Sequence, residues 1–339
     1  AGLVAGAAAG GYGMLKLASD VDSSQKRIQG QLGVTGAEAK KLNGITQSLW
    51  KEGFGQDMSE VRNGLIQVRQ NIKGLNSGDL KQVTKDSLTL AEVFDADVNE
   101  VTRAGSNVMK GFGTSSKEAF DLMAWGAQNG LNFSNEMFDN LSEYAPLYKK
   151  MGFSATEYFQ LLKKGTDSGV YNLDYINDAM KEFQIRVKDG SKGVAEGFGQ
   201  LSSKTKQVWS DFNQGKATVK DVHNAVINDL KNMDNQVKAN QIGVALYGTK
   251  FEDLQADSMY ALGNIDGSIK GVKGSMDKAS EANENFARRA KALFREFVSG
   301  LAPFGNSLLD IGERLLPKVE ASINKVSTAF INLPPAAQD

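Results

Sequence analysis

Cysteine is absent from the 339 residues, and histidine occurs once, at His223. Without cysteine the chain can form no disulfide, zinc–thiolate site, iron–sulfur cluster or thiol nucleophile. A single imidazole also excludes two-histidine metal sites and most serine–histidine relays within one chain. We therefore predict that His223 is an ordinary helix residue. We also predict that the protein uses no cofactor and no metal, and that it is not an enzyme.

Other motifs that carry chemistry are missing too. Carboxylate pairs such as Asp95 with Asp97 diverge on a helix, and no loop with calcium-ligand spacing surrounds them. The glycine-rich strings at residues 110–113 and 196–199 lack the lysine–hydroxyl ending of a P-loop, and no GxSxG elbow occurs. These features favour solvated faces and turns over a catalytic site.

No excess of charge of either sign is present, because 39 basic residues stand against 40 acidic ones and leave a net charge of -1. No global field attracts the protein to a polyanion. Specific nucleic-acid binding is therefore not expected.

Long hydrophobic runs are also absent. The apolar stretch at residues 1–15 is shorter than the roughly 20 residues that span a bilayer. Within it Gly2, Gly6 and Gly10 share one helix face, which predicts close contact with another helix or a membrane partner; a flexible or closely packed small-residue helix is the alternative. The first residue is Ala1 rather than methionine, which favours a fragment or a processed product. A signal peptide is not favoured, because no charged start precedes the apolar stretch.

Proline is scarce, with five in the chain, and this scarcity fits many helices in series. What recurs instead is a hydroxyl residue followed three positions later by glutamate, the spacing of a capping box. The pattern predicts an all-α fold in which short capped helices and helical hairpins precede longer amphipathic helices; an elongated rod and a bundle both remain open. The capping pairs are Thr35 with Glu38, Ser115 with Glu118, Ser154 with Glu157, and Thr249 with Glu252.

Two predicted helix starts carry a hydrophobic staple, an apolar pair that flanks the cap. Phe153 and Tyr158 flank Ser154, and Phe133 and Phe138 flank Ser134. Glycine is expected to end the helices because it enters the left-handed conformation freely. The predicted stops are Gly111, Gly113, Gly130, Gly152, Gly165, Gly169 and Gly190.

Composition changes along the chain predict its domains. Aromatic residues disappear over residues 263–285, where glycine, serine and charge increase, which is typical of a linker. The predicted parts are an entry region of small-residue and amphipathic helices at 1–57, a helical region at 58–262, a linker at 263–285 and amphipathic helices at 286–339.

The last part has two apolar stripes with helical spacing. We predict that they contact other helices, within the protein or between copies, with membrane contact as the alternative because the first helix also carries basic residues. Pro317 should kink or restart the second stripe. The first stripe contains Phe286, Ala290, Leu293, Phe294, Phe297, Val298 and Leu301, with Arg288, Arg289, Lys291 and Arg295 on its other faces. The second contains Leu308, Ile311, Leu315, Val319, Ile323, Val326 and Phe330.

Three motifs resemble the central helical region of tail tape measure proteins from long-tailed bacteriophages or prophages. The first is the hairpin FSNEMFDNLSEYAPLYKKMGFSATEYFQLLKKGTDSG, with its turn at residues 151–157. The second is ALYGTKFEDL at residues 245–254, and the third is LAPFGNSLLDIGERLLPKVEASINKVSTAF near the end. Small apolar residues leading into KLASD at 16–20 are similar to the usual entry to this region, so the resemblance covers most of the chain.

The resemblance implies a structural, tape-measuring role. In that family a helical polymer occupies the tail lumen, sets tail length and is released during genome ejection. It implies as partners further copies of the chain (a homo-oligomer such as a trimer), tail-tube and tail-tip proteins, tail assembly chaperones and the host membrane. It implies a location in the virion tail, and in the host cytoplasm during assembly. The short capped helices, however, favour a compact or tip-proximal part over a uniform ruler.

Two alternatives belong to other classes of protein. One is a membrane-active, pore-forming helical protein whose active elements would be the apolar amino terminus and residues 286–330. The other is a lytic enzyme, whose paired carboxylates sequence spacing cannot display.

Overall fold

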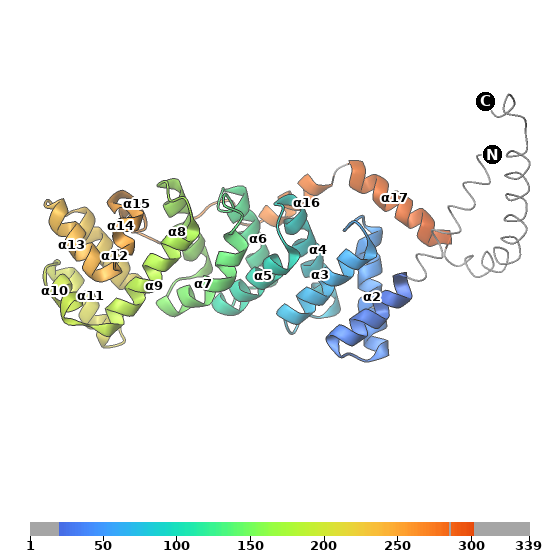
Figure 1. Ribbon diagram of the computed structural model, residues 1–339, viewed down its shortest axis with the longest axis horizontal. Helices are drawn as coiled ribbons and strands as arrows, with labels where there is room; N and C mark the ends of the chain where they lie inside the picture. The colour runs from blue at the N-terminus through green and yellow to red at the C-terminus, as the bar shows by residue number, and fades with distance from the viewer. Residues whose placement is uncertain (1–19, 285, 302–339) are drawn as a thin grey trace, which may run out of the picture. The chain divides into compact units, whose positions relative to one another are not determined.

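The computed structural model describes residues 20–284 and 286–301, and this part of the chain is built from α-helices and turns with no strand (Figure 1). The predicted all-α fold is confirmed. The described chain divides into two compact units, which we treat separately: unit 1 comprises residues up to Ile66 and from Asn285 onward, and unit 2 comprises Gln67–Glu284.

Unit 1 contains a helix over residues 20–32, then α2 (Gly36–Lys51), the first part of α3 (Met58–Asn71) and α17 (Phe286–Leu301). The helix α17 packs against α2, although the two are far apart in sequence. Unit 1 is therefore closed by a segment from the other end of the described chain.

Unit 2 is a succession of helices in which α5 packs against α4, α6 and α7, and α9 packs against α7, α8, α13 and α14. After α15 the chain turns back, so that α16 packs on the much earlier α4 and α6 (Figure 1). We call residues 263–284 the return segment. The helices of unit 2 are α4 (Ser77–Val93), α5 (Val98–Phe112), α6 (Ser116–Gln128), α7 (Met137–Met151), α8 (Ala155–Asp167), α9 (Leu173–Asp189), α10 (Lys192–Gly199), α11 (Ser203–Asn213), α12 (Val219–Lys231), α13 (Gln236–Tyr247), α14 (Lys250–Leu254), α15 (Ala256–Ala261) and α16 (Ser275–Asn283).

Most of the predicted caps form. The hydroxyls of Thr35, Ser115 and Ser154 accept the predicted amide hydrogen bonds at the starts of α2, α6 and α8, and Ser154 with Glu157 completes a capping box. The prediction at Thr249 is wrong: α14 does begin at the next residue, but Thr249 already has helical dihedral angles and its side chain caps nothing. A residue in that conformation cannot present its hydroxyl as an N-cap does.

One of the two predicted staples is wrong. Phe153 and Tyr158 are buried, and both rings contact Tyr148, with centroids 5.3 and 3.9 Å away. In contrast, α7 begins at Met137 without a side-chain cap, and Phe133 is 45% exposed. The polar run after α6 forms turns instead of an immediate helix start.

The glycines separate into two kinds. Gly113, Gly152 and Gly190 end helices in the left-handed conformation, as predicted, and Gly130 and Gly169 lie in turns with positive φ. The predictions for Gly111 and Gly165 are wrong, because both lie inside helices. At Gly165 an added Cβ would lie 2.3 Å from Ile176 Cδ1. This glycine therefore allows α8 and α9 to approach closely.

Candidate interaction surfaces

The predicted contact residues fall into three groups. Leu293 and Phe294 are described, and each is 68% exposed on α17. Phe286, Phe297 and Leu301 belong to the same helix, but their side chains lie outside the described part of the structure. Gly2, Gly6, Gly10, Leu308, Ile311 and Leu315 lie outside the described residues altogether. Contact with a partner therefore remains a prediction for every member of the set.

Arg295 on α17 holds the turn that follows α2 in unit 1. Its guanidinium donates hydrogen bonds of 2.9 Å to the backbone carbonyls of Trp50, Phe54, Gly55 and Gln56. The fixed fork of five donors in arginine suits such a group of carbonyls. Burial lowers the pKa of Arg295, and its side chain is almost fully enclosed.

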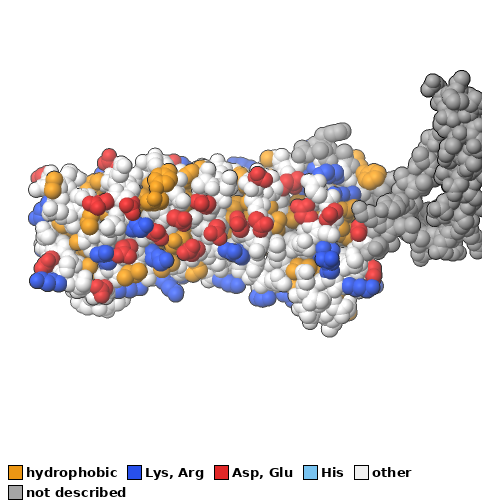
Figure 2. All heavy atoms as spheres, in the orientation of Figure 1, with side chains coloured by type: hydrophobic (Ala, Val, Ile, Leu, Met, Phe, Trp, Pro, Cys, Tyr) orange, Lys and Arg blue, Asp and Glu red, His pale blue; other side chains and the backbone are white. Residues whose placement is uncertain are grey.

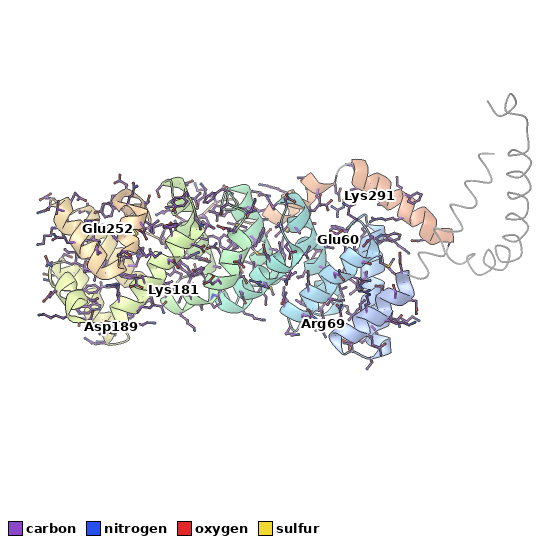
Figure 3. All side chains as sticks on the ribbon, viewed as in Figure 1. Glu60, Arg69, Lys181, Asp189, Glu252 and Lys291 are labelled. Atoms are coloured by element: carbon purple, nitrogen blue, oxygen red, sulfur yellow. The ribbon has the colours of Figure 1, made fainter. Side chains whose placement is uncertain are left out.

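Arg288 makes a second contact to the same turn. Its guanidinium carbon lies 3.5 Å from the centroid of the Phe54 ring, a cation–π geometry. Gly53 has φ +93° and lies so close that an added Cβ would be 2.9 Å from Arg288 Cγ. Further along α17, Lys291 donates to Gln56 at 3.3 Å; Figure 3 labels Lys291 on α17 and Glu60 on α3. Two arginines of the basic flank thus face the protein, while Leu293 and Phe294 face outward.

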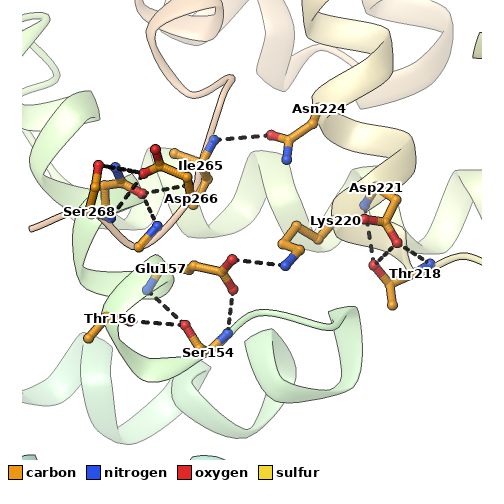
Figure 4. Close-up of polar contacts among 12 residues, drawn as sticks. Ser154, Thr156, Glu157, Thr218, Lys220, Asp221, Asn224, Ile265, Asp266 and Ser268 are labelled. Carbon is orange, nitrogen blue, oxygen red and sulfur yellow. Dashed lines mark hydrogen bonds and ion pairs between the residues drawn. The ribbon is translucent and has the colours of Figure 1, made fainter.

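In unit 2 the return segment is bound through its backbone. The side-chain oxygen Oε1 of Gln160 on α8 accepts from the backbone amides of Asp266 and Gly267 at 2.9 and 2.8 Å, and its side-chain nitrogen Nε2 donates to Asp266 Oδ1. Lys164, one turn later, donates to the carbonyl oxygens of Gly263 and Asn264. Hydrogen bonds from Ser268 hold the pKa of Asp266 well below its usual range. Figure 4 shows this turn with the neighbouring Glu157–Lys220 ion pair.

Helix α6 continues the same contact. Trp125 Nε1 donates to the Lys270 carbonyl at 2.9 Å, Gln128 donates to the Ser275 carbonyl, and buried Asp121 accepts from the Met276 amide. At the end of the segment Asn283 donates to Glu92 on α4. The irregular part of the return segment thus makes most of its hydrogen bonds to other helices with side chains that lie 99 or more positions earlier in the chain. The predicted role of residues 263–285 as a linker between domains stays a prediction.

His223 lies in α12 and is fully buried. Its Nδ1 is 2.8 Å from the Tyr247 hydroxyl, and its Nε2 is 2.9 Å from the Leu262 carbonyl. A neutral imidazole satisfies both contacts if Nε2–H donates to Leu262 and Nδ1 accepts from Tyr247. Burial lowers the pKa of His223 from 6.5 to about 4. The residue therefore stays neutral at pH 7 and stabilises the core.

Within the described ranges, no group of histidine, aspartate and glutamate side chains could hold a metal ion. No helix in that part of the chain is both long enough and apolar enough to cross a bilayer.

The described part of the chain is a succession of capped α-helices, and the comparisons with known proteins identify its family. Residues 40–294 match the model of the phage-related minor tail protein family, and the chain belongs to that family. It therefore has a structural role in a phage tail, and the predicted resemblance to tape measure proteins is confirmed. Membership of a structural family also favours a non-enzymatic role.

Two curated proteins are similar over most of the chain. The "Probable tape measure protein" of Streptomyces phage phiC31 is 27% identical over 280 residues, which are 80% of this chain and 38% of that protein. The "Uncharacterized protein YqbO" of Bacillus subtilis is 24% identical over 281 residues, or 82% of this chain and 17% of that protein. The chain thus spans less than two fifths of the length of either relative. No solved structure matches it significantly.

Three features were not predicted from the sequence: the carbonyl contacts of Arg295, the backbone contacts of the return segment and the exposure of Phe133. The first two join positions that are 99 or more residues apart, and a single sequence has no periodic signal for such contacts. A weak signal did exist for the third, because Asn132 and Asn135 flank Phe133 and asparagine favours turns.

Proposed function

We propose that the chain is part of a tape measure that occupies the tail lumen, sets tail length during assembly and leaves the tail during genome ejection. The family match over residues 40–294, together with the likeness to a protein named as a probable tape measure protein, carries the proposal. The helical build of both units supports it, because a helix gives a fixed length for each residue.

Length control can be tested by deletion in the phage that encodes the chain. The larger of two deletions removes unit 2, roughly 220 residues, which as continuous helix would span about 330 Å at about 1.5 Å per residue. Deleting residues 137–167, which form α7 and α8, removes roughly 31 residues and about 46 Å of helix. Tail lengths measured by electron microscopy should shorten in proportion to the deletion if this region is extended inside the tail.

The outcomes separate two forms of the role. Proportional shortening for both deletions supports the ruler and means that unit 2 unfolds into extended helix in the tail. A shortening much smaller than proportional means that unit 2 stays folded there and that other parts of the longer protein measure length. Tails of unchanged length after both deletions would contradict a measuring role for this chain.

The same proposal names the partners. Copies of the chain, such as a trimer, would associate with tail-tube and tail-tip proteins in the virion tail. Assembly chaperones would bind it in the host cytoplasm, and the host membrane would meet it at ejection. Membership of a tail protein family supports contact with other tail components.

A further inference from the structure

The chain after α15 runs back along the helices that precede it. The return segment first contacts α8 through Gln160 and then α6 through Trp125, and its helix α16 packs on α6 and α4 (Figure 1). The next helix, α17, packs on α2 in unit 1. We call α4–α15 the helical array, and the return segment together with α17 the strap. Successive parts of the strap are thus attached to successively earlier helices.

The strap is held mainly by polar contacts. The buried apolar side chains of the return segment are Ile265, Met276 and Ala279. Among the described side chains of α17, the buried ones are Arg288 and Arg295, and Arg295 is held by its hydrogen bonds to backbone carbonyls. A hydrogen bond contributes only about 1 kcal/mol net to stability. Each part of the strap is therefore attached by a few contacts of modest strength.

The helices of the array are held by apolar burial instead. Figure 2 shows acidic and basic side chains mixed over the visible face, with hydrophobic side chains between them in small groups. Most of the large apolar side chains lie inside, and α8 alone buries Tyr158, Phe159, Leu161 and Leu162. Burying one such side chain contributes about 1.5–3 kcal/mol. Segments with few buried apolar contacts open more easily than the core, so the strap should detach more easily than any helix of the array.

The order of these contacts makes the direction of a pull decisive. Tension on the far end of the strap reaches the contacts of α17, then those of α16, and then those of the irregular part, so each group bears the whole tension alone. Tension that separates α4 from α15 loads the strap contacts on α8, α6 and α4 at the same time, together with the packing of the array. The force at which a contact yields is set by its rate of opening, and contacts that share a load open more slowly.

We propose that the strap detaches under tension on its own far end before the helical array opens, whereas it resists tension applied across the array. The protein is then easy to open from one direction and hard to open from the other. Detachment of the strap is the first step of the release proposed above for genome ejection, and in this respect its purpose rests on the tape-measure role. The mechanical behaviour itself is a property of the isolated chain and can be measured without a tail.

Optical tweezers on the full chain test the proposal. The chain has no cysteine, so handles can be attached at two introduced cysteines. Lys73→Cys with Glu296→Cys pulls on the strap, and Lys73→Cys with Asp257→Cys pulls across the array as the matched control; all three positions are exposed. We expect the first pair to yield at low force in steps that release roughly 34 residues, about 115 Å of extended chain, before the array opens at higher force. The second pair should lack these early steps.

A variant of the strap contacts identifies which bonds bear the load. Gln160→Ala with Trp125→Phe removes three hydrogen bonds to the backbone of the return segment. With the first pair of handles, this change should lower the force of the last step of strap release and leave the released length unchanged. Gln207→Ala, which removes an exposed contact within α11, should leave the trace as it is. The comparison of the two handle pairs needs neither variant, so it stands even if the double variant folds poorly.

Three results would overturn the proposal. The first is a first pair of handles with which the array opens before the strap or in the same step. The second is a second pair that shows early low-force steps of the same length. The third is an unchanged release force in the double variant, which would mean that the bonds of Gln160 and Trp125 do not hold the strap. None of these results bears on tail length, so the proposal and the tape-measure role can fail separately.

Discussion

His223 is a buried polar side chain that has a hydrogen-bond partner at each ring nitrogen, the Tyr247 hydroxyl and the Leu262 carbonyl. A protonated imidazole would donate from both nitrogens, and Tyr247 would then need another acceptor for its own proton. His223 and Tyr247 are both fully buried, so bulk solvent cannot reach the hydroxyl to accept that proton. The environment therefore excludes the charged form, which agrees with the lowered pKa.

This exclusion makes stability depend on pH. The pKa of His223 is 6.5 when unfolded and about 4 when folded, so the unfolded chain gains a proton first as pH falls. The contribution of His223 to the free energy of unfolding is therefore fully present above pH 6.5. It decreases by about 3 kcal/mol as the pH falls to 4. His223→Gln keeps one donor and one acceptor but does not titrate, so its unfolding free energy should lose this pH dependence. Urea titrations at several pH values measure the slope.

Because Asp86 also makes stability depend on pH, the unfolding free energies of the wild type and of His223→Gln must be compared with each other. Burial raises the pKa of this carboxyl group to about 6, so its contribution strengthens as pH falls over much of the same range. The difference between wild type and variant cancels this opposing effect. A variant with the same slope as the wild type would show that His223 does not control it.

Arg295 supports a second residue-scale prediction. Replacing it by methionine removes the guanidinium bonds to four backbone carbonyls and should destabilise the packing of α17 on α2 by about 3 kcal/mol. Hydrogen exchange should rise in α17 and in residues 50–56. Arg289→Met, on an exposed part of the same helix, should have a much smaller effect. If Arg295→Met and Arg289→Met destabilise the protein equally, Arg295 acts through its positive charge and not through its hydrogen bonds to the carbonyls.

At the scale of elements, most of the predicted N-caps formed, whereas several predicted helix stops were wrong and the helix neighbours were not predicted. Caps at Ser115 and Ser154 follow from spacing alone, because both partners lie within four residues. Gly165 was predicted as a stop, yet its small size serves contact with Ile176. Sequence shows that a position is glycine but not whether it supplies a left-handed turn or space for a neighbour.

Gly113 and Gly152 separate these two effects. Both end helices with positive φ, but nothing lies within 4 Å of a Cβ added at Gly113, whereas one at Gly152 would lie 2.5 Å from Thr218 Cβ. Gly113→Ala should cost only backbone strain, about 1–2 kcal/mol. Gly152→Ala should cost at least about 1 kcal/mol more through the clash. Thermal unfolding of the two variants tests the order, and equal losses would mean that α12 shifts freely away from α7.

At the scale of the molecule, the return segment decides how unit 2 unfolds. Most helices of unit 2 pack on helices that are nearby in sequence. An array of this kind can lose its terminal helices one by one during unfolding. The return segment joins α15 to α8, α6 and α4 through Gln160, Trp125 and Asn283. Opening either end of the array therefore breaks contacts at the other, which favours unfolding in one step.

Weakening the return segment should remove this cooperativity. Gln160→Ala combined with Trp125→Phe deletes three hydrogen bonds to its backbone while leaving α6 and α8 intact. We expect a smaller denaturant m-value, since unfolding is then no longer all-or-none. Hydrogen exchange should increase first at residues 263–284 and next in α4 and α6. Gln207→Ala, which removes an exposed contact within α11, serves as the control. A double variant that unfolds at lower denaturant with an unchanged m-value would show that direct packing between helices suffices for cooperativity.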